Sequence, residues 1–147
     1  MFTKDFDSLA SDGDKITCTV DGFECTAVSI RDDSGDSPED RDDGFWPSLD
    51  PNVAGYIGDK TEAELAVETA KAQAIMDAWK RDEWDYCGVC VVVSRAGVQL
   101  TPRYANALWG IERNYPGSDN SYLRCVANEL LGEALDAAKA KLSELCA

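Results

Sequence analysis

The segment that most constrains the fold is an uninterrupted run of eight uncharged residues from Tyr86 to Val93. The run is rich in valine and cysteine, and two tryptophans, Trp79 and Trp84, lie just before it. A run of this length and composition is typical of a β-strand that is buried on both faces. No other segment of the chain has this character, so we expect the remaining strands and the helices to pack around it.

A second strand signal lies near the N-terminus, where Asp21-Gly22 separates two runs of alternating residues. This pattern predicts a hairpin with a type I′ turn that pairs residues 16–20 with 23–27. In that register one face carries six side chains: Ile16, Cys18, Val20, Phe23, Cys25 and Ala27. The two cysteines lie opposite each other, which would suit a disulfide or a metal pair but is more typical of small apolar core residues in a reducing compartment.

Two segments carry helical patterns. The first follows Thr61 and Glu64, which have the spacing of a capping box, and continues to about Arg81. Its apolar stripe has the period of an amphipathic helix and consists of Leu65, Thr69, Ala72, Met76 and Trp79. The second segment spans about residues 121–145 and has a wide apolar face, with Ser118, Asp119 or Asn120 as its N-cap.

Between the central run and the last helix the sequence predicts two more strands. A three-residue hairpin loop at 95–97, with Gly97 in the left-handed conformation, leads to a returning strand at 98–101. A short last strand covers 108–112, where Gly110 leaves room for a neighbouring ring. This order predicts an α+β fold: an antiparallel sheet of about four to five strands with two main helices packed on one face. At 147 residues, the chain is expected to form a single domain, 1–147.

The hairpin and the first helix are separated by about residues 31–60, which have no apolar periodicity. The half before Phe45 is rich in aspartate and glycine, whereas the second half contains Phe45, Trp46 and Tyr56. Loops longer than about 12–15 residues are uncommon in compact domains and are usually functional or disordered. We therefore expect a long acidic and aromatic loop, with its aromatic half packed on the rest of the protein.

The net charge of −14 is distributed unevenly. Residues 1–64 hold 17 acidic and 5 basic residues, whereas residues 65–147 hold 11 acidic and 9 basic residues. Nucleic acid and anionic membranes would be repelled by such a surface, so we expect no direct nucleic-acid or membrane partner. A charged partner of this protein would be basic, unless the acidic surface serves only solubility.

No catalytic or metal-binding pattern is specific enough to assign. Cys87 and Cys90 have a Cys-x-x-Cys spacing, but a zinc site would need a second ligand pair, and residues three apart in a strand point to opposite faces. The run from Asp32 to Asp43 has the length of a calcium loop but lacks its glycine and its final glutamate. The chain also has no histidine, the commonest general base. We expect no enzyme, no cofactor and no metal.

The start of the chain lacks the basic and apolar regions of a signal peptide, and no apolar run approaches the length of a membrane span. We therefore expect a cytoplasmic protein whose six cysteines are reduced thiols.

Two segments, AWKRDEWDYCGV at 78–89 and ALWGIE at 107–112, carry a resemblance to known proteins. In these segments the chain resembles a loose group of small acidic proteins carried by phages and plasmids. The resemblance covers about residues 60–140 and leaves the acidic loop outside. It implies a mobile-element accessory protein, a class that includes inhibitors of host defence, and it carries over no functional residue.

The sequence therefore favours a non-enzymatic binding protein of a phage or plasmid, located in the cytoplasm of a host bacterium. Its acidic N-terminal half would bind a basic, nucleic-acid-binding surface of a host protein, as a DNA mimic or an anti-defence inhibitor of the restriction or CRISPR type. The candidate partner-binding residues are Asp32, Asp33, Asp36, Glu39, Asp40, Asp42, Asp43 and Trp46. The alternative is a phage assembly or regulatory adaptor that binds a protein through the aromatic loop Phe45–Tyr56.

Overall fold

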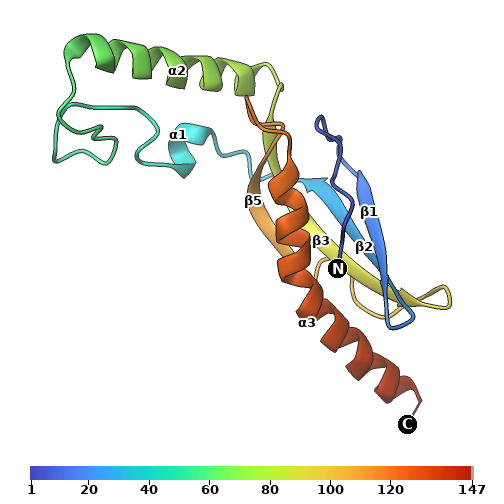
Figure 1. Cartoon of the computed structure of the whole chain (residues 1–147). Coiled ribbons are helices and arrows are strands. Elements are labelled where there is room, and N and C mark those ends of the chain that lie inside the picture. The colour runs from blue at the N-terminus through green and yellow to red at the C-terminus, as the bar shows by residue number, and fades with distance from the viewer. Residues whose placement is uncertain (147) are drawn as a thin grey trace. The chain divides into compact units, whose positions relative to one another are not determined.

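The computed structural model describes residues 1–146, which fall into two compact units (Figure 1). The sheet unit comprises Met1–Asp32 and the chain from Asp85 onward, and the acidic unit comprises Asp33–Trp84. That the whole chain unfolds as a single domain stays a prediction.

The sheet unit is built on five antiparallel strands. These are β1 (Lys15–Val20), β2 (Phe23–Arg31), β3 (Asp85–Arg95), β4 (Val98–Gln99) and β5 (Ala107–Arg113). The strands follow the order β1-β2-β3, and both β4 and β5 pair with β3. Helix α3 (Ser121–Leu145) lies across one face of this sheet and packs mainly against β3 (Figure 1). The predicted α+β class with an antiparallel sheet is confirmed.

The predicted N-terminal hairpin is confirmed in every pair. Val20 lies opposite Phe23 and Cys18 lies opposite Cys25. Both turn residues have positive φ, 50° at Asp21 and 82° at Gly22, as a type I′ turn requires. The turn chemistry thus sets the register, and the register places the apolar side chains of the hairpin on the face that packs against α3.

The central strand β3 is buried, as its composition predicts. Cys87, Val89, Val91 and Val93 belong to the core on the side of α3 and are fully buried. Cys90 is also fully buried but points to the opposite side of the strand. On α3 the core is completed mainly by small and medium side chains, namely Leu123, Ala127, Leu131, Ala134 and Ala138. The alanines let the helix lie close to the valine-rich strand.

The predicted three-residue loop after β3 is wrong in detail. Arg95 pairs directly with Val98, so the turn has two residues, Ala96 and Gly97, and both have positive φ. The two-residue turn is favoured because its twist matches that of the strands. An aromatic ring packs on Gly88, where an added Cβ would lie 2.4 Å from Trp109 Cε3.

Gly110 has a different role, because its φ of 74° belongs to an irregular step in the pairing of β3 with β5. Its backbone N–H donates to the carboxylate of Asp32 at 3.0 Å. The irregularity turns this N–H away from the regular ladder, and Asp32 satisfies it.

The N-terminal segment contributes to the core without forming a regular element. Phe2 and Phe6 are buried in the core cluster between the sheet and α3. The side chain of Asn128 accepts a hydrogen bond from Phe2 N at 2.7 Å and donates to Phe2 O at 3.1 Å. Asn114 contacts the backbone of Ala10 in the same way, at 2.7 and 2.8 Å. These two side-chain amides satisfy backbone N–H and C=O groups of the N-terminal segment, as strand pairing does in the sheet.

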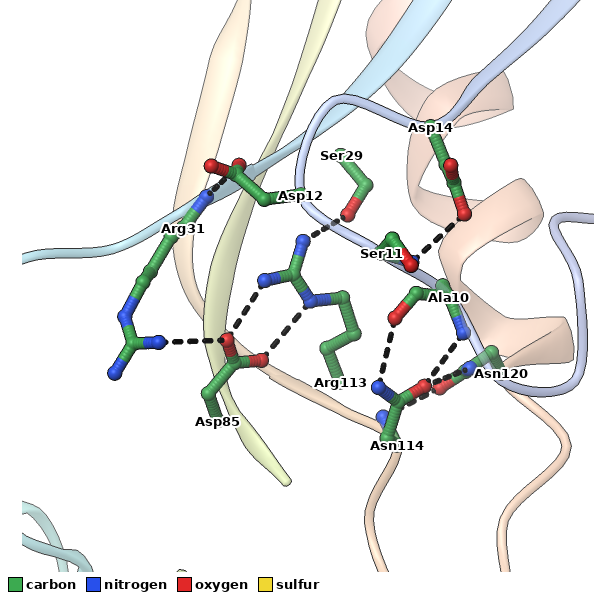
Figure 2. Close-up of polar contacts among 10 residues, drawn as sticks. All are labelled: Ala10, Ser11, Asp12, Asp14, Ser29, Arg31, Asp85, Arg113, Asn114 and Asn120. Carbon is green, nitrogen blue, oxygen red and sulfur yellow. Dashed lines mark hydrogen bonds and ion pairs between the residues drawn. The ribbon is translucent and has the colours of Figure 1, made fainter. Parts of the chain in front are cut away.

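A buried ion pair joins β3 to β5 (Figure 2). The guanidinium of Arg113 donates to both carboxylate oxygens of Asp85, at 2.9 and 2.7 Å, and to the hydroxyl of Ser29 at 2.7 Å. Burial alone would lower the pKa of Arg113, but the hydrogen bonds and the charge of Asp85 raise it above its ordinary value. Arg31 adds a second cation at 3.9 Å from Asp85. Strands β2, β3 and β5 therefore share one charged network.

The acidic unit contains a one-turn helix, α1 (Pro38–Arg41), and the longer helix α2 (Glu62–Lys80). The predicted capping box of Thr61 and Glu64 is confirmed. The predicted apolar stripe is buried only in the second half of α2, at Ala72 and Met76, whereas Thr69 is exposed. The buried indole of Trp84 donates to the carbonyl of Ile75 at 2.9 Å and fixes the chain beyond the helix.

No helix among the residues that the structure describes is both long and apolar enough to cross a membrane.

Replacing Arg113 with methionine should lower the free energy of unfolding by about 3–5 kcal/mol, because it leaves the carboxylate of Asp85 without its bidentate partner. Urea unfolding measures this. The matched control is Arg124→Met, which breaks the more exposed pair with Asp5 and should cost at most about 1 kcal/mol. Equal losses in the two variants would contradict a special role for the Asp85–Arg113 pair.

Replacing Phe2 with alanine should lower the free energy of unfolding by about 3–5 kcal/mol, as for other buried aromatic residues. Leu9→Ala in the same segment is the control, since Leu9 is 73% exposed and should change stability by no more than about 0.5 kcal/mol. An unchanged urea midpoint for Phe2→Ala would show that the N-terminal segment is dispensable.

Candidate functional site

The charge asymmetry between residues 1–64 and 65–147 does not follow the two units, because Met1–Asp32 belongs to the sheet unit. The acidic unit holds 14 acidic and 5 basic residues, a net charge of −9. The longer sheet unit holds 14 acidic and 9 basic residues, a net charge of −5. The net negative charge is therefore higher in the shorter unit, which makes this unit the better candidate for an electrostatic binding surface.

Most of the predicted partner-binding carboxylates lie together and are exposed. They occupy α1 and the residues on either side of it: Asp33, Asp36, Glu39, Asp40, Asp42 and Asp43. Arg41 is the single basic residue between Asp32 and Asp59, and it contacts the hydroxyl of Ser34. A segment of this kind presents a dense negative charge to solvent.

Asp32 stands apart from the other candidates. It lies in the sheet unit, is half-buried, and donates its backbone N–H to the carbonyl of Tyr86 at 2.9 Å. Its carboxylate accepts from Gly110, as described above. Asp32 thus extends the contact between β2 and β3 and supports β5, and its position in the sequence does not distinguish this role from that of the neighbouring acidic residues.

Local hydrogen bonds give the acidic segment a defined shape. Pro38 is buried at the first turn of α1, where its fixed φ suits a helix start. The hydroxyl of Ser37 donates to Asp40 at 3.0 Å, and the carboxylate of Asp42 accepts from Gly44 N at 2.8 Å. These contacts restrict the carboxylates before any partner arrives, which reduces the ordering cost of binding.

Trp46 links the acidic half of this segment to the aromatic half. Its indole N–H donates to Glu39 Oε2 at 2.9 Å, and its ring meets Phe45 edge-on, with centroids 5.0 Å apart. Both rings are half-buried. Tyr56 is more exposed, at 39%, and Val53 at 45%. Trp46 therefore serves local structure at least as much as it offers a contact surface.

The arrangement displays charge rather than a coordination site. Among residues 1–146, no group of three or more histidine, cysteine, aspartate or glutamate side chains is placed to hold a metal ion. The carboxylates of the acidic segment bind neighbouring hydroxyl and backbone groups instead.

All six cysteines are free thiols in the structure. Cys87 and Cys90 point to opposite sides of β3, as predicted from their spacing, so they form no pair. Burial raises the pKa of Cys25 and of Cys87 to about 11, and it also raises that of Cys90. Cys125 and Cys146 are exposed on α3 and at its end. The two most accessible thiols are thus those of Cys125 and Cys146, while Cys18 is half-buried.

Comparison of the chain with protein families, with curated proteins and with solved structures gave no match, so the resemblance to phage and plasmid proteins stays a prediction.

In the native protein at pH 8, a disulfide reagent should modify two thiols quickly, those of Cys125 and Cys146. Cys25 and Cys87 should react far more slowly, because with a pKa of about 11 only roughly one in a thousand is a thiolate at that pH, and both are buried. Stopped-flow absorbance counts the fast thiols, and titration in denaturant should count all six cysteines. A third fast thiol that disappears in Cys87→Ala would contradict the burial of β3.

Proposed function

We propose that this chain is a non-enzymatic accessory protein of a phage or plasmid that acts in the cytoplasm of a host bacterium. Its acidic segment, residues 33–43, would bind a basic, nucleic-acid-binding surface of a host protein, as a DNA mimic or an anti-defence inhibitor of the restriction or CRISPR type. The observation that carries the proposal is the set of six exposed carboxylates on and around α1 with one cation among them.

The physical basis is the match between carboxylates and phosphates. Duplex DNA presents about one negative charge per 1.7 Å of its axis, and proteins that bind it line their grooves with lysine and arginine. Six carboxylates within an eleven-residue segment offer such a groove a comparable density of charge. Long-range attraction then steers the encounter, and the contact competes directly with nucleic acid for the same cations.

Two features of the segment support a binding role over a purely solubilising one. Three of its six carboxylates, those of Asp40, Asp42 and Glu39, accept hydrogen bonds from Ser37, Gly44 and Trp46, so half of the charge has a defined geometry. The charge is also gathered in one unit, whereas a solubilising surface needs only scattered charges of both signs.

A second candidate function is a phage assembly or regulatory adaptor that binds a protein partner through the aromatic loop Phe45–Tyr56. The observation in its favour is the exposure of Val53 and Tyr56. Aromatic anchors dominate many protein interfaces. The internal hydrogen bond and half-burial of Trp46 make it the weaker candidate.

The decisive variant changes Asp33, Asp36, Asp40, Asp42 and Asp43 to asparagine. Asparagine keeps an acceptor oxygen for the contacts with Ser37 and Gly44, and Glu39 stays in place to hold Trp46. Stability should therefore change by no more than about 0.5 kcal/mol. Binding to the host proteins captured from a bacterial lysate should weaken, mainly through a slower association rate, and should lose most of its salt dependence. Surface plasmon resonance against the identified partner, at low and high salt, measures both.

The matched control removes five exposed acidic side chains of the sheet unit by changing Glu24, Glu129, Glu133, Asp136 and Glu144 to their amides. It lowers the net charge equally and should leave binding nearly intact. Duplex DNA should displace the captured partner from the wild-type protein. Full binding without the five aspartates, together with loss of binding in Trp46→Ala or Tyr56→Ala, would replace the DNA mimic with the aromatic adaptor.

A further inference from the structure

The face of the sheet that points away from α3 carries a hollow of about 340 Å³. Its walls and floor come from all of the first four strands and from the residues after β4. The lining side chains are Lys15, Thr26, Val28, Val92, Ser94, Gln99 and Arg103. The hollow is therefore a product of strand register: Lys15 lies opposite Val28, Thr26 opposite Val92, and Ser94 opposite Gln99.

The chemistry of this lining is unusual for so acidic a chain. Two cationic side chains, two hydroxyls and an amide surround the two valines of the floor, and none of the described lining residues is a carboxylate. Small-molecule sites typically combine an apolar floor with a few convergent polar groups, in volumes of about 300–1,000 Å³. The hollow reaches the lower end of that range, and it is more polar than a typical site, with five polar or charged side chains and two valines in its described lining.

The two cations have no anionic partner among residues 1–146. Four of the nine basic residues of the sheet unit form ion pairs within it: Arg31 and Arg113 contact Asp85, Arg124 contacts Asp5, and Lys141 contacts Glu144. Lys15 forms no such ion pair, and the guanidinium of Arg103 lies over the ring of Tyr104, at 5.4 Å from its centroid. Lys15 also borders a second hollow that contains Asp5, Asp7 and Asp14. It is the convergence of Lys15 with Arg103 on one hollow without a carboxylate in its described lining that makes this hollow suited to an anion.

An aromatic pair adjoins Arg103. Tyr104 and Trp109 lie with their centroids 6.0 Å apart, and both are partly exposed. Trp109 packs on Gly88, whose position in β3 belongs to the same face of the sheet as Val92 and Ser94. A ligand seated on this face could therefore place a ring or an apolar group beside these side chains.

We propose that this hollow binds a small phosphate monoester whose organic part is apolar or aromatic. Lys15 supplies a point charge and Arg103 a planar fork of donors, which together balance the nearly two negative charges of a phosphate monoester. The hydroxyls of Thr26 and Ser94 can donate to its remaining oxygens. The site is separate from the acidic segment, so it stands whether or not the protein is a DNA mimic.

The test uses the full-length ¹⁵N-labelled protein at low ionic strength, with phenyl phosphate as the probe. Titration followed by NMR should give saturable shifts of the backbone amides around Thr26, Val28, Val92 and Ser94. Inorganic phosphate should bind more weakly because it lacks the apolar body, and benzoate should bind more weakly because it carries one charge. Benzoate binding as tight as that of phenyl phosphate would overturn the assignment of a phosphate ester.

The double variant Lys15→Gln/Arg103→Gln should weaken phenyl phosphate binding by about tenfold or more, since it removes both charge-assisted contacts. The control, Lys80→Gln/Lys139→Gln, removes two exposed cations elsewhere and should leave the affinity within about twofold. Ser94→Tyr, which fills the hollow and keeps both charges, should also abolish binding. Shifts that are absent, that spread over the other lysines, or that persist unchanged in Lys15→Gln/Arg103→Gln would overturn the proposal.

Discussion

The ion pair of Asp85 with Arg113 occupies the position on which the rest of the structure depends, the start of β3. The chain leaves the sheet unit after Asp32 and returns at Asp85. These two points are neighbours, because Asp32 N donates to Tyr86 O and Arg31 lies opposite Cys87. The acidic unit is thus inserted between two adjacent antiparallel strands, as a hairpin loop would be. The entropy cost of closing a loop grows only slowly with its length, and the charged network of Arg31, Asp85 and Arg113 joins the strands at which the insertion begins and ends.

This arrangement explains how the fold tolerates its charge. In the sheet unit, Arg113 joins two strands through Asp85, and Arg124 joins α3 to the N-terminal segment through Asp5. These ion pairs neutralise part of the acidity of that unit. The acidic segment contains one cation, and carboxylates in it accept hydrogen bonds from neutral groups, such as the backbone N–H of Gly44 and the indole N–H of Trp46. The Debye length at physiological salt is about 8 Å. Repulsion between exposed carboxylates that are farther apart than this is largely screened, so each carboxylate repels mainly its close neighbours. The apolar core beneath α3 contains no residue of the acidic unit, so its packing does not require any of these carboxylates to be buried.

What the sequence predicts well are features with a local cause. The Asp21-Gly22 turn, the capping box at Thr61 and the uncharged run of β3 each follow from a few adjacent residues, and each is observed. What it misses depends on residues distant in the chain. Phe2 has no periodic neighbours, and its burial depends on Asn128. Gly88 and Gly110 look alike in sequence, yet the irregular pairing of β3 with β5 gives one a close ring and the other a positive φ. Asp32 cannot be told from Asp33 until the register shows which of them reaches Gly110.

The same reasoning applies to function. An acidic run is visible in the sequence because its members are consecutive, so the candidate surface on α1 was predictable residue by residue, apart from Asp32. The hollow on the opposite face of the sheet from α3 could not be predicted from the sequence. Lys15 and Arg103 lie far apart in the chain, and three strand pairings bring them to the same hollow. Two of those pairings, β1 with β2 and β3 with β4, depend on the tight turns at Asp21-Gly22 and Ala96-Gly97, whose positive φ values set the register. A one-residue slip of β2 in the first hairpin would turn the hydroxyl of Thr26 toward the core, and a slip of β4 in the second would do the same to the amide of Gln99. The turn residues thus fix both the core on one side of the sheet and the chemistry displayed on the other.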